Sequence, residues 1–403
     1  MTGQSKIDAA AHLNTAVRVT TPMSNFDDIR PYNDSEVRPA LDRLVKDPEL
    51  INALCRLRFP KAASGMGWLL KPLVSKALQR QLHGIDSVAG LQQLVSGYLD
   101  RMMQKRVDHF SISGLDKLDP DKPYLFISNH RDIAMDPAFI NWALHSNGYD
   151  TVRIAIGDNL LTKPYVSDLM RLNKSFIVNR SAETNREKFK ASKHLSAYMH
   201  HSIVEEKSNL WIAQREGRAK DGRDATNAAV ISMLALSKPK AMSLTDYIGE
   251  SNIVPVAISY EWDPCDAAKT NELHTLQQTG NYEKSEHEDV ASIAAGIAGD
   301  KGSVHVAFGD VLAGEYESTD QVAAEIDRQI WDNYVLHPSN LLAYEMLTGK
   351  ASDLPVGASQ EAFDSENFHA QKLALMARLC KVDDLQRDIL LGIYANPVIA
   401  KLS

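Results

Sequence analysis

The sequence predicts an α/β fold with an N-terminal helical region, an α/β domain whose largely parallel or mixed sheet is flanked by helices, and a helical C-terminal extension. Three observations predict it. Apolar residues recur at helical spacing before residue 107, short β-rich runs then alternate with helical stretches, and residues 341–403 return to a helical pattern. We therefore divide the chain into a flexible arm (1–33), a helical region (34–106), the α/β domain (107–340) and the extension (341–403).

The N-terminal quarter of the chain consists of a polar segment followed by a helical region. Residues 1–33 lack the apolar core of a secretory signal. From residue 34 the pattern predicts three to five helices, and Asp47-Pro48 separates the first two. The run Trp68-Leu69-Leu70 is open to two interpretations, an apolar lip for a lipid chain or, as we favour, the core of a helical bundle.

The middle of the chain predicts the sheet. Its strands are the runs DHFSISGL, YLFISN, VRIAIG, SFIVN, NLWIA, IVPVAISY and VHVAF. Helical stretches separate them, as in βαβ units, and we interpret the polar stretch 269–289 as a loop. Because open α/β sheets place their ligands beyond the carboxyl ends of the strands, functional side chains are expected there.

Composition limits the function classes. A net charge of −8 argues against bulk affinity for nucleic acid or anionic lipid. Cys55, Cys265 and Cys380 lie far apart, which predicts neither a disulfide framework nor a metal cluster and favours a reducing compartment. His287 lacks metal-ligand spacing, so no metal is expected. No run approaches the ~18 apolar residues of a spanning helix. We expect a cytoplasmic protein that touches a membrane at most peripherally.

The stretch SNHRDIAMDPAF follows the strand YLFIS and raises a choice. His130 is either a general base oriented by Asp132 or Asp136, or an incidental residue between a strand and a helix whose N-cap is Asp136. A protein-kinase catalytic loop is excluded, because the Asn required five residues after Asp132 is replaced by Pro137.

Three further strand ends carry polar or unusual residues. LWIAQREGRAKDGRD runs from an apolar strand into glycines and cations, which predicts an anion site, with a solvated charge run as the alternative. The block from Gly157 ends at Arg180, whose planar fork suits a phosphate or carboxylate. Pro255 lies inside an apolar strand, where we expect an edge, a bulge or a site wall.

Taken in order, these four blocks resemble the glycerolipid acyltransferases, the family of the glycerol-3-phosphate and lysophosphatidate enzymes. That family has a His-Asp block, a block ending in Arg, an E-G-x-R block and a proline-containing strand, and the resemblance spans residues 107–310. The helical region and the lack of spanning segments look closer to the soluble glycerol-3-phosphate acyltransferases. One departure is that five residues, not the usual four, separate His130 from Asp136, with Met135 at the expected position.

The resemblance implies transfer of an acyl group from acyl-CoA or acyl carrier protein to glycerol 3-phosphate, with no further cofactor. His130 would be the base and Asp136 its partner, and the substrate would contact Arg180, Glu216, Gly217, Arg218, Lys220, Arg223 and Pro255. Lysophosphatidate is the alternative acceptor, and a non-catalytic, acyltransferase-like lipid-binding protein is the alternative function. A hydrolase is disfavoured, because no G-x-S-x-G pattern occurs.

Overall fold

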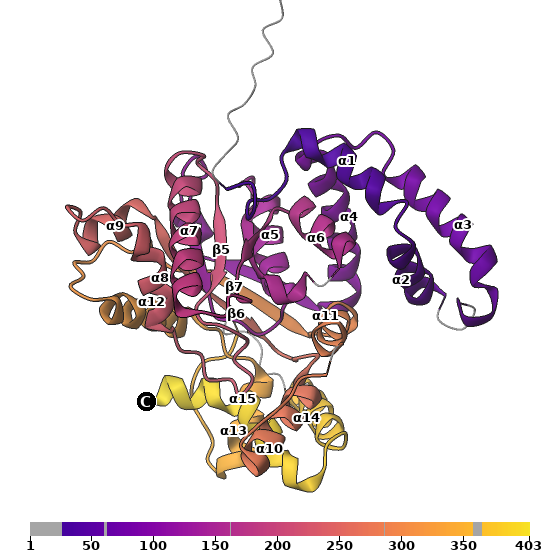
Figure 1. Cartoon of the computed structure of the whole chain (residues 1–403). Coiled ribbons are helices and arrows are strands. Elements are labelled where there is room, and N and C mark those ends of the chain that lie inside the picture. Colours follow the sequence, from indigo (N-terminus) through magenta and orange to yellow (C-terminus); the bar gives the residue numbers. More distant parts are fainter. Residues whose placement is uncertain (1–25, 60–62, 162, 286, 358–364) are drawn as a thin grey trace, which may run out of the picture.

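The computed structural model describes residues 26–59, 63–161, 163–285, 287–357 and 365–403 (Figure 1). The predicted helical region is confirmed as α1 (Asp34–Leu44), α2 (Pro48–Arg58), α3 (Ala63–Gln81) and α4 (Val88–Arg106). Asn33 and Glu36 form a capping box at the start of α1, and Asp47 caps α2 with Pro48 at its first position.

The flexible arm is a wrong prediction for its last residues. Ile29 is buried, and its carbonyl accepts a hydrogen bond from the Ile177 amide at 2.9 Å. Arg30 pairs with Asp27 and Glu36. Residues 26–33 are therefore packed against the α/β domain. The rest of the predicted arm, residues 1–25, lies outside the described residues.

The predicted strands are all present in one mixed sheet. They are β1 (His109–Ser113), β2 (Leu125–Ser128), β3 (Arg153–Gly157), β4 (Ser175–Val178), β5 (Leu210–Ala213), β6 (Ile253–Tyr260) and β7 (Ser303–Phe308). Their order is β1-β7-β6-β2-β5-β3-β4, and every pair is parallel except β6 with β7. The carboxyl ends of β2, β3, β4 and β5 consequently meet at one edge of the sheet.

Helices cover both faces of this sheet (Figure 1). They are α5 (Met135–Ser146), α6 (Pro164–Leu172), α7 (Asn185–Val204), α8 (Ala228–Leu234), α9 (Leu244–Glu250) and α12 (Thr319–Asn333). Short 3₁₀ turns are Leu115–Lys117, Asp158–Leu160, Ala235–Ser237 and Asp384–Gln386.

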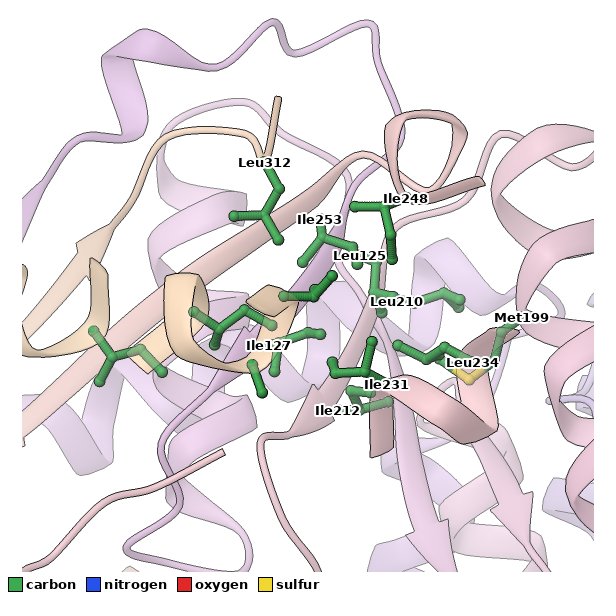
Figure 2. Close-up of a cluster of buried hydrophobic side chains, with 14 of the residues drawn as sticks. Leu125, Ile127, Met199, Leu210, Ile212, Ile231, Leu234, Ile248, Ile253 and Leu312 are labelled. Atoms are coloured by element: carbon green, nitrogen blue, oxygen red, sulfur yellow. The ribbon is translucent and has the colours of Figure 1, made fainter. Parts of the chain in front are cut away.

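Alternation along the strands feeds two cores. Leu125 and Ile127 of β2 join the cluster beneath α7, α8 and α12, whereas Phe126 joins the cluster beneath α5. Figure 2 shows the first cluster, with side chains of β2, β5 and β6 against Ile231 and Leu234 of α8. Strands buried on both faces explain the nearly continuous apolar runs in the sequence.

The stretch predicted as a loop is mostly helical. Asp266–Thr279 forms α10, and Glu288–Ala298 forms α11. The loop prediction is wrong because the buried residues of α10 are polar, among them Lys269, Thr270 and Glu272. A helix that buries polar groups leaves no apolar stripe in the sequence to reveal it.

The extension is helical as predicted, with α13 (Pro338–Thr348), α14 (Ser365–Leu379) and α15 (Arg387–Leu402). These helices pack together and against α10, below the sheet in the view of Figure 1. Within the described part of the chain, no helix is both long enough and apolar enough to span a bilayer.

Pro255 lies in an interior strand, so the predicted edge or bulge is wrong. β6 pairs with β2 on one side and β7 on the other, and Pro255 stands opposite Ile127. Its carbonyl accepts from the Gly309 amide at 2.8 Å, just beyond the last residue of β7. Because the N and O of one strand residue face the same side, the missing N–H of Pro255 faces the end of the β7 ladder, where it disrupts little.

Candidate active site

His130 and Asp136 form a hydrogen-bonded pair in the turn after β2. The Nδ1 atom of His130 lies 2.8 Å from Oδ2 of Asp136, and the two side chains are 13% and 0% exposed. The rings of Trp211 of β5 and His130 form a T-shaped pair, with centroids 5.7 Å apart. A carboxylate on Nδ1 makes that nitrogen the donor and leaves Nε2 free to accept a proton.

Asp136 is fixed by three further donors. Its Oδ2 accepts from the backbone amides of Arg131 at 2.7 Å and Asp132 at 3.0 Å. Its Oδ1 accepts from the Tyr260 hydroxyl at 2.6 Å. Burial, together with the charge of Asp136, raises the pKa of Tyr260 well above its ordinary value, so this hydroxyl keeps its proton.

Asp132, not Asp136, binds the backbone amides where α5 begins. Its Oδ1 accepts from the amides of Ala134 and Met135, both at 2.9 Å. The helix begins at Met135, which places Asp136 in the first turn and makes its predicted N-cap role wrong. Burial raises the pKa of the Asp132 carboxyl, and the charge of Asp136 adds to that shift. The extra residue between His130 and Asp136 thus lies in the turn whose amides Asp132 binds.

The basic loop, residues 215–223, lies directly beside this turn. The Gln214 amide donates to the Ser128 carbonyl at 2.8 Å, which extends the β2–β5 pairing past the strand ends. The Ala219 amide donates to the His130 carbonyl at 2.9 Å. A backbone hydrogen bond therefore links the predicted catalytic histidine to the predicted anion site.

Arg180 and Glu216 are brought together at the same edge. Arg180 Nη1 lies 3.4 Å from Glu216 Oε1, and the side chains are 39% and 75% exposed. Gly157, at the end of β3, leaves room for Arg180, since a Cβ built there would lie 3.0 Å from Arg180 Nε. Glu216, which the resemblance assigns to the substrate, therefore faces Arg180 in the structure.

The three later cations of the loop differ in their surroundings. The Arg218 side chain is only 6% exposed; among the residues that the structure describes, its guanidinium makes no hydrogen bond, and its carboxylate partner is Asp289 at 4.0 Å. Lys220 forms an ion pair with Glu272 of α10. Arg223 is exposed. A guanidinium that makes no hydrogen bond within the described structure keeps its donors for a bound anion.

Pro255 and Gly217, the two remaining predicted substrate contacts, have no side chain that can donate a hydrogen bond. Pro255 is buried inside β6, level with Ile127 and three positions before His130 on the next strand. Gly217 adopts φ 74° and turns the basic loop, and a Cβ there would meet no atom within 4 Å.

Several supporting residues had escaped the sequence analysis. Arg131 Nη2 contacts buried Asp224 Oδ2 at 2.6 Å, and Asn129 reaches the same oxygen at 3.1 Å. Lys269 Nζ of α10 donates to the Arg131 carbonyl at 2.7 Å. Polar residues that follow strands were visible in the sequence, but their partners come from more than 90 positions away.

The C-terminal extension also buttresses the basic loop. Asn396 Nδ2 of α15 donates to the Asp221 carbonyl at 2.6 Å. Gly222 has φ 82°, and a Cβ built there would lie 2.3 Å from the Ile393 carbonyl oxygen. The sequence places no candidate site residue in this extension, yet the extension fixes the end of the basic loop.

Gly222→Ala should therefore destabilise the protein more than Gly217→Ala. Both glycines have positive φ, which costs an L-residue about 1–2 kcal/mol, but only Gly222 adds a collision with backbone. Chemical denaturation of the two variants measures the difference. Equal losses of unfolding free energy would show that α15 does not constrain the loop.

Comparison with known proteins identifies the domain. Residues 109–259 match the model of the family described as Acyltransferase. No curated protein matches the chain. Among solved structures, the 1-acyl-sn-glycerophosphate (LPA) acyltransferase PlsC from Thermotoga maritima aligns over 70% of this chain and 94% of its own, with 13% identity and a TM-score of 0.33. The family match covers the turn of His130, Arg180, the basic loop and all of β6 but its last residue. Over residues 109–259 the chain is thus similar to the acyltransferase family.

Proposed function

We propose that this protein transfers an acyl group from a thioester, acyl-CoA or acyl carrier protein, to a hydroxyl of glycerol 3-phosphate. The observation that carries the proposal is the position of the His130–Asp136 pair beside the basic loop. The His130 carbonyl accepts a hydrogen bond from this loop, and Arg218 of the loop makes no hydrogen bond through its guanidinium within the described residues. A base and an anion anchor at one sheet edge suit an acceptor with a hydroxyl near a phosphate.

His130 acts as general base on the acceptor hydroxyl. Its Nε2 accepts the proton as the hydroxyl oxygen attacks the thioester carbon. The resulting imidazolium is stabilised by Asp136, which holds Nδ1–H at 2.8 Å. The C–S bond then breaks, and the thiol leaves with the proton that His130 returns. Because the acceptor is the nucleophile, no acyl-enzyme forms and no further cofactor is needed.

The cations hold the acceptor phosphate. Arg218 is the central one, because its donors are not engaged within the described structure. Arg180, held by Glu216, and exposed Arg223 contribute from the rim. Lys220 contributes to phosphate binding only indirectly, because it already forms an ion pair with Glu272. Fixing the phosphate places the hydroxyl beside His130 and makes the encounter effectively unimolecular.

An assay that crosses two acceptors with two donors tests the proposal. Glycerol 3-phosphate should be acylated with a higher kcat/KM than lysophosphatidate, with acyl-CoA or with acyl carrier protein. A preference for lysophosphatidate would transfer the proposal to that acceptor. Binding of either acceptor without turnover, for all four combinations, would favour the lipid-binding alternative, against which the intact 2.8 Å His130–Asp136 contact argues.

We further propose that α2 and α3 contact an anionic membrane surface. No acidic residue occurs between Glu49 and Asp86, while six lysines and arginines do, in a chain of net charge −8. Trp68 and Leu73 are 77% and 59% exposed. In Figure 1, α3 stands away from the sheet and packs beside α2. Exposed apolar side chains among cations suit the interface of anionic lipid.

The double variant Trp68→Glu/Leu73→Glu should lose binding to vesicles containing phosphatidylglycerol. Leu385→Glu is the matched control, because Leu385 is 80% exposed but lies in the C-terminal extension. Sedimentation of vesicles measures both. In cells, high salt or carbonate should release the wild-type protein from membranes, and extraction by detergent alone would contradict a peripheral contact.

A further inference from the structure

Helix α11 lies across both parts of the candidate site. Near its start, Asp289 Oδ1 lies 4.0 Å from Nη2 of Arg218. Farther along, Gly296 faces the dyad turn so closely that a Cβ built there would lie 2.1 Å from Asp132 Oδ2. Residues seven positions apart share a helix face. One face of α11 therefore contacts the basic loop and the turn of His130 together.

Two carboxylates, one on α10 and one on α11, contact the basic loop in different ways. Glu272 of α10 is in direct contact with Lys220, so that cation is already neutralised. Asp289 stays outside hydrogen-bond reach of Arg218 and forms its own pair with Lys284 at 2.8 Å. Arg218 keeps its donors for another anion, but that anion must bind near a fixed negative charge.

We propose that Asp289 sets the affinity of the Arg218 site, because its carboxylate weakens the binding of phosphate there. This inference rests on the proposed function, since it concerns the phosphate of the same acceptor. The repulsion acts on every phosphate dianion alike. Free inorganic phosphate has no other contacts to compensate for it, whereas a glycerol phosphate adds those of its hydroxyls. The carboxylate thus weakens the binding of inorganic phosphate and of glycerol phosphate by the same factor, and the hydroxyl contacts set the preference between them.

The test is calorimetric binding of inorganic phosphate, without acyl donor, to the full-length protein. Asp289→Asn should tighten binding by roughly three- to tenfold, the range for a partly screened charge near a buried one. Glu288→Gln, which removes an equal charge at the adjacent position, should change it little, because Glu288 faces Tyr282 at 2.8 Å. Lys284→Gln should weaken phosphate binding, because the negative charge of Asp289 then loses the cation that partly neutralises it.

The double variant Lys284→Gln/Asp289→Asn separates two causes of the gain. If the gain persists, lost repulsion explains it, and if it disappears, the freed Lys284 was the cause and the proposal falls. An unchanged or weaker affinity in Asp289→Asn, or the same gain in Glu288→Gln, also overturns it.

The proposed function fails differently. If wild-type protein binds neither inorganic phosphate nor glycerol 3-phosphate and Asp289→Asn restores neither, the anion site and this inference fall together. If Arg218→Ala abolishes phosphate binding while Asp289→Asn is neutral, only this inference falls.

Discussion

Replacing His130 with alanine is expected to lower kcat by about 10²–10⁴-fold, the usual loss for a general base. The hydroxyl then has no partner for its proton during attack, while the basic loop keeps its Ala219–His130 backbone contact. Acceptor affinity should therefore stay nearly unchanged. Steady-state kinetics gives kcat, and calorimetry with glycerol 3-phosphate gives the affinity. Full transfer activity in His130→Ala would overturn the acyltransferase mechanism.

Asp136→Asn and Asp132→Asn should separate the two acidic residues of this turn. The amides of Arg131 and Asp132 both donate to Oδ2 of Asp136, so an asparagine there must keep its oxygen at that position. The His130 tautomer is then preserved, and what is lost is the charge opposite the imidazolium. A hydrogen bond to a charged group contributes about 1.5–3 kcal/mol, which predicts a drop in kcat of roughly 10–150-fold.

Asp132→Asn is the matched control, one carboxyl changed to an amide in the same turn. Asparagine caps helices well, and Asp132 contacts the amides of Ala134 and Met135 rather than His130. Its kcat should fall less than about tenfold, since the base and its partner are untouched. A larger loss of kcat in Asp132→Asn than in Asp136→Asn would show that Asp136 is not the partner of His130.

Arg218→Ala should raise the KM for the acceptor by about 10–150-fold and leave the KM for the donor nearly unchanged, as expected for one charge-assisted contact. The buried position of Arg218 is the reason, because solvent screens a buried charge least. Arg223→Ala, an exposed arginine on the same loop, should have a smaller effect. Equal changes in both KM values for Arg218→Ala would contradict phosphate binding by this residue.

The sequence predicted the sheet because its strands are apolar on both faces and separated by helices. It predicted His130, Asp136 and the basic loop because polar residues at the ends of buried strands converge at one edge. In the structure Asp136, not Asp132, contacts His130, whereas the N-cap expected of Asp136 does not form.

What the sequence could not predict depends on contacts between distant positions. Tyr260 meets Asp136 across 124 residues, and Asn396 meets Asp221 across 175. Helix α10 was hidden because its buried residues are polar. Pro255 suggested an edge strand, and only the end of β7 at Phe308 explains how an interior strand tolerates it.

The measurement that tests the central claim most directly is a single-turnover reaction of the wild-type protein with an acyl thioester. After the reaction is quenched, mass spectrometry measures the mass of the intact protein and identifies the small-molecule product. Direct transfer predicts acylated glycerol phosphate when glycerol 3-phosphate is present, and unmodified protein when it is withheld. Asp136→Asn should give the same product more slowly. Protein that becomes acylated without acceptor, or a wild-type reaction that yields no product with glycerol 3-phosphate, would contradict the account.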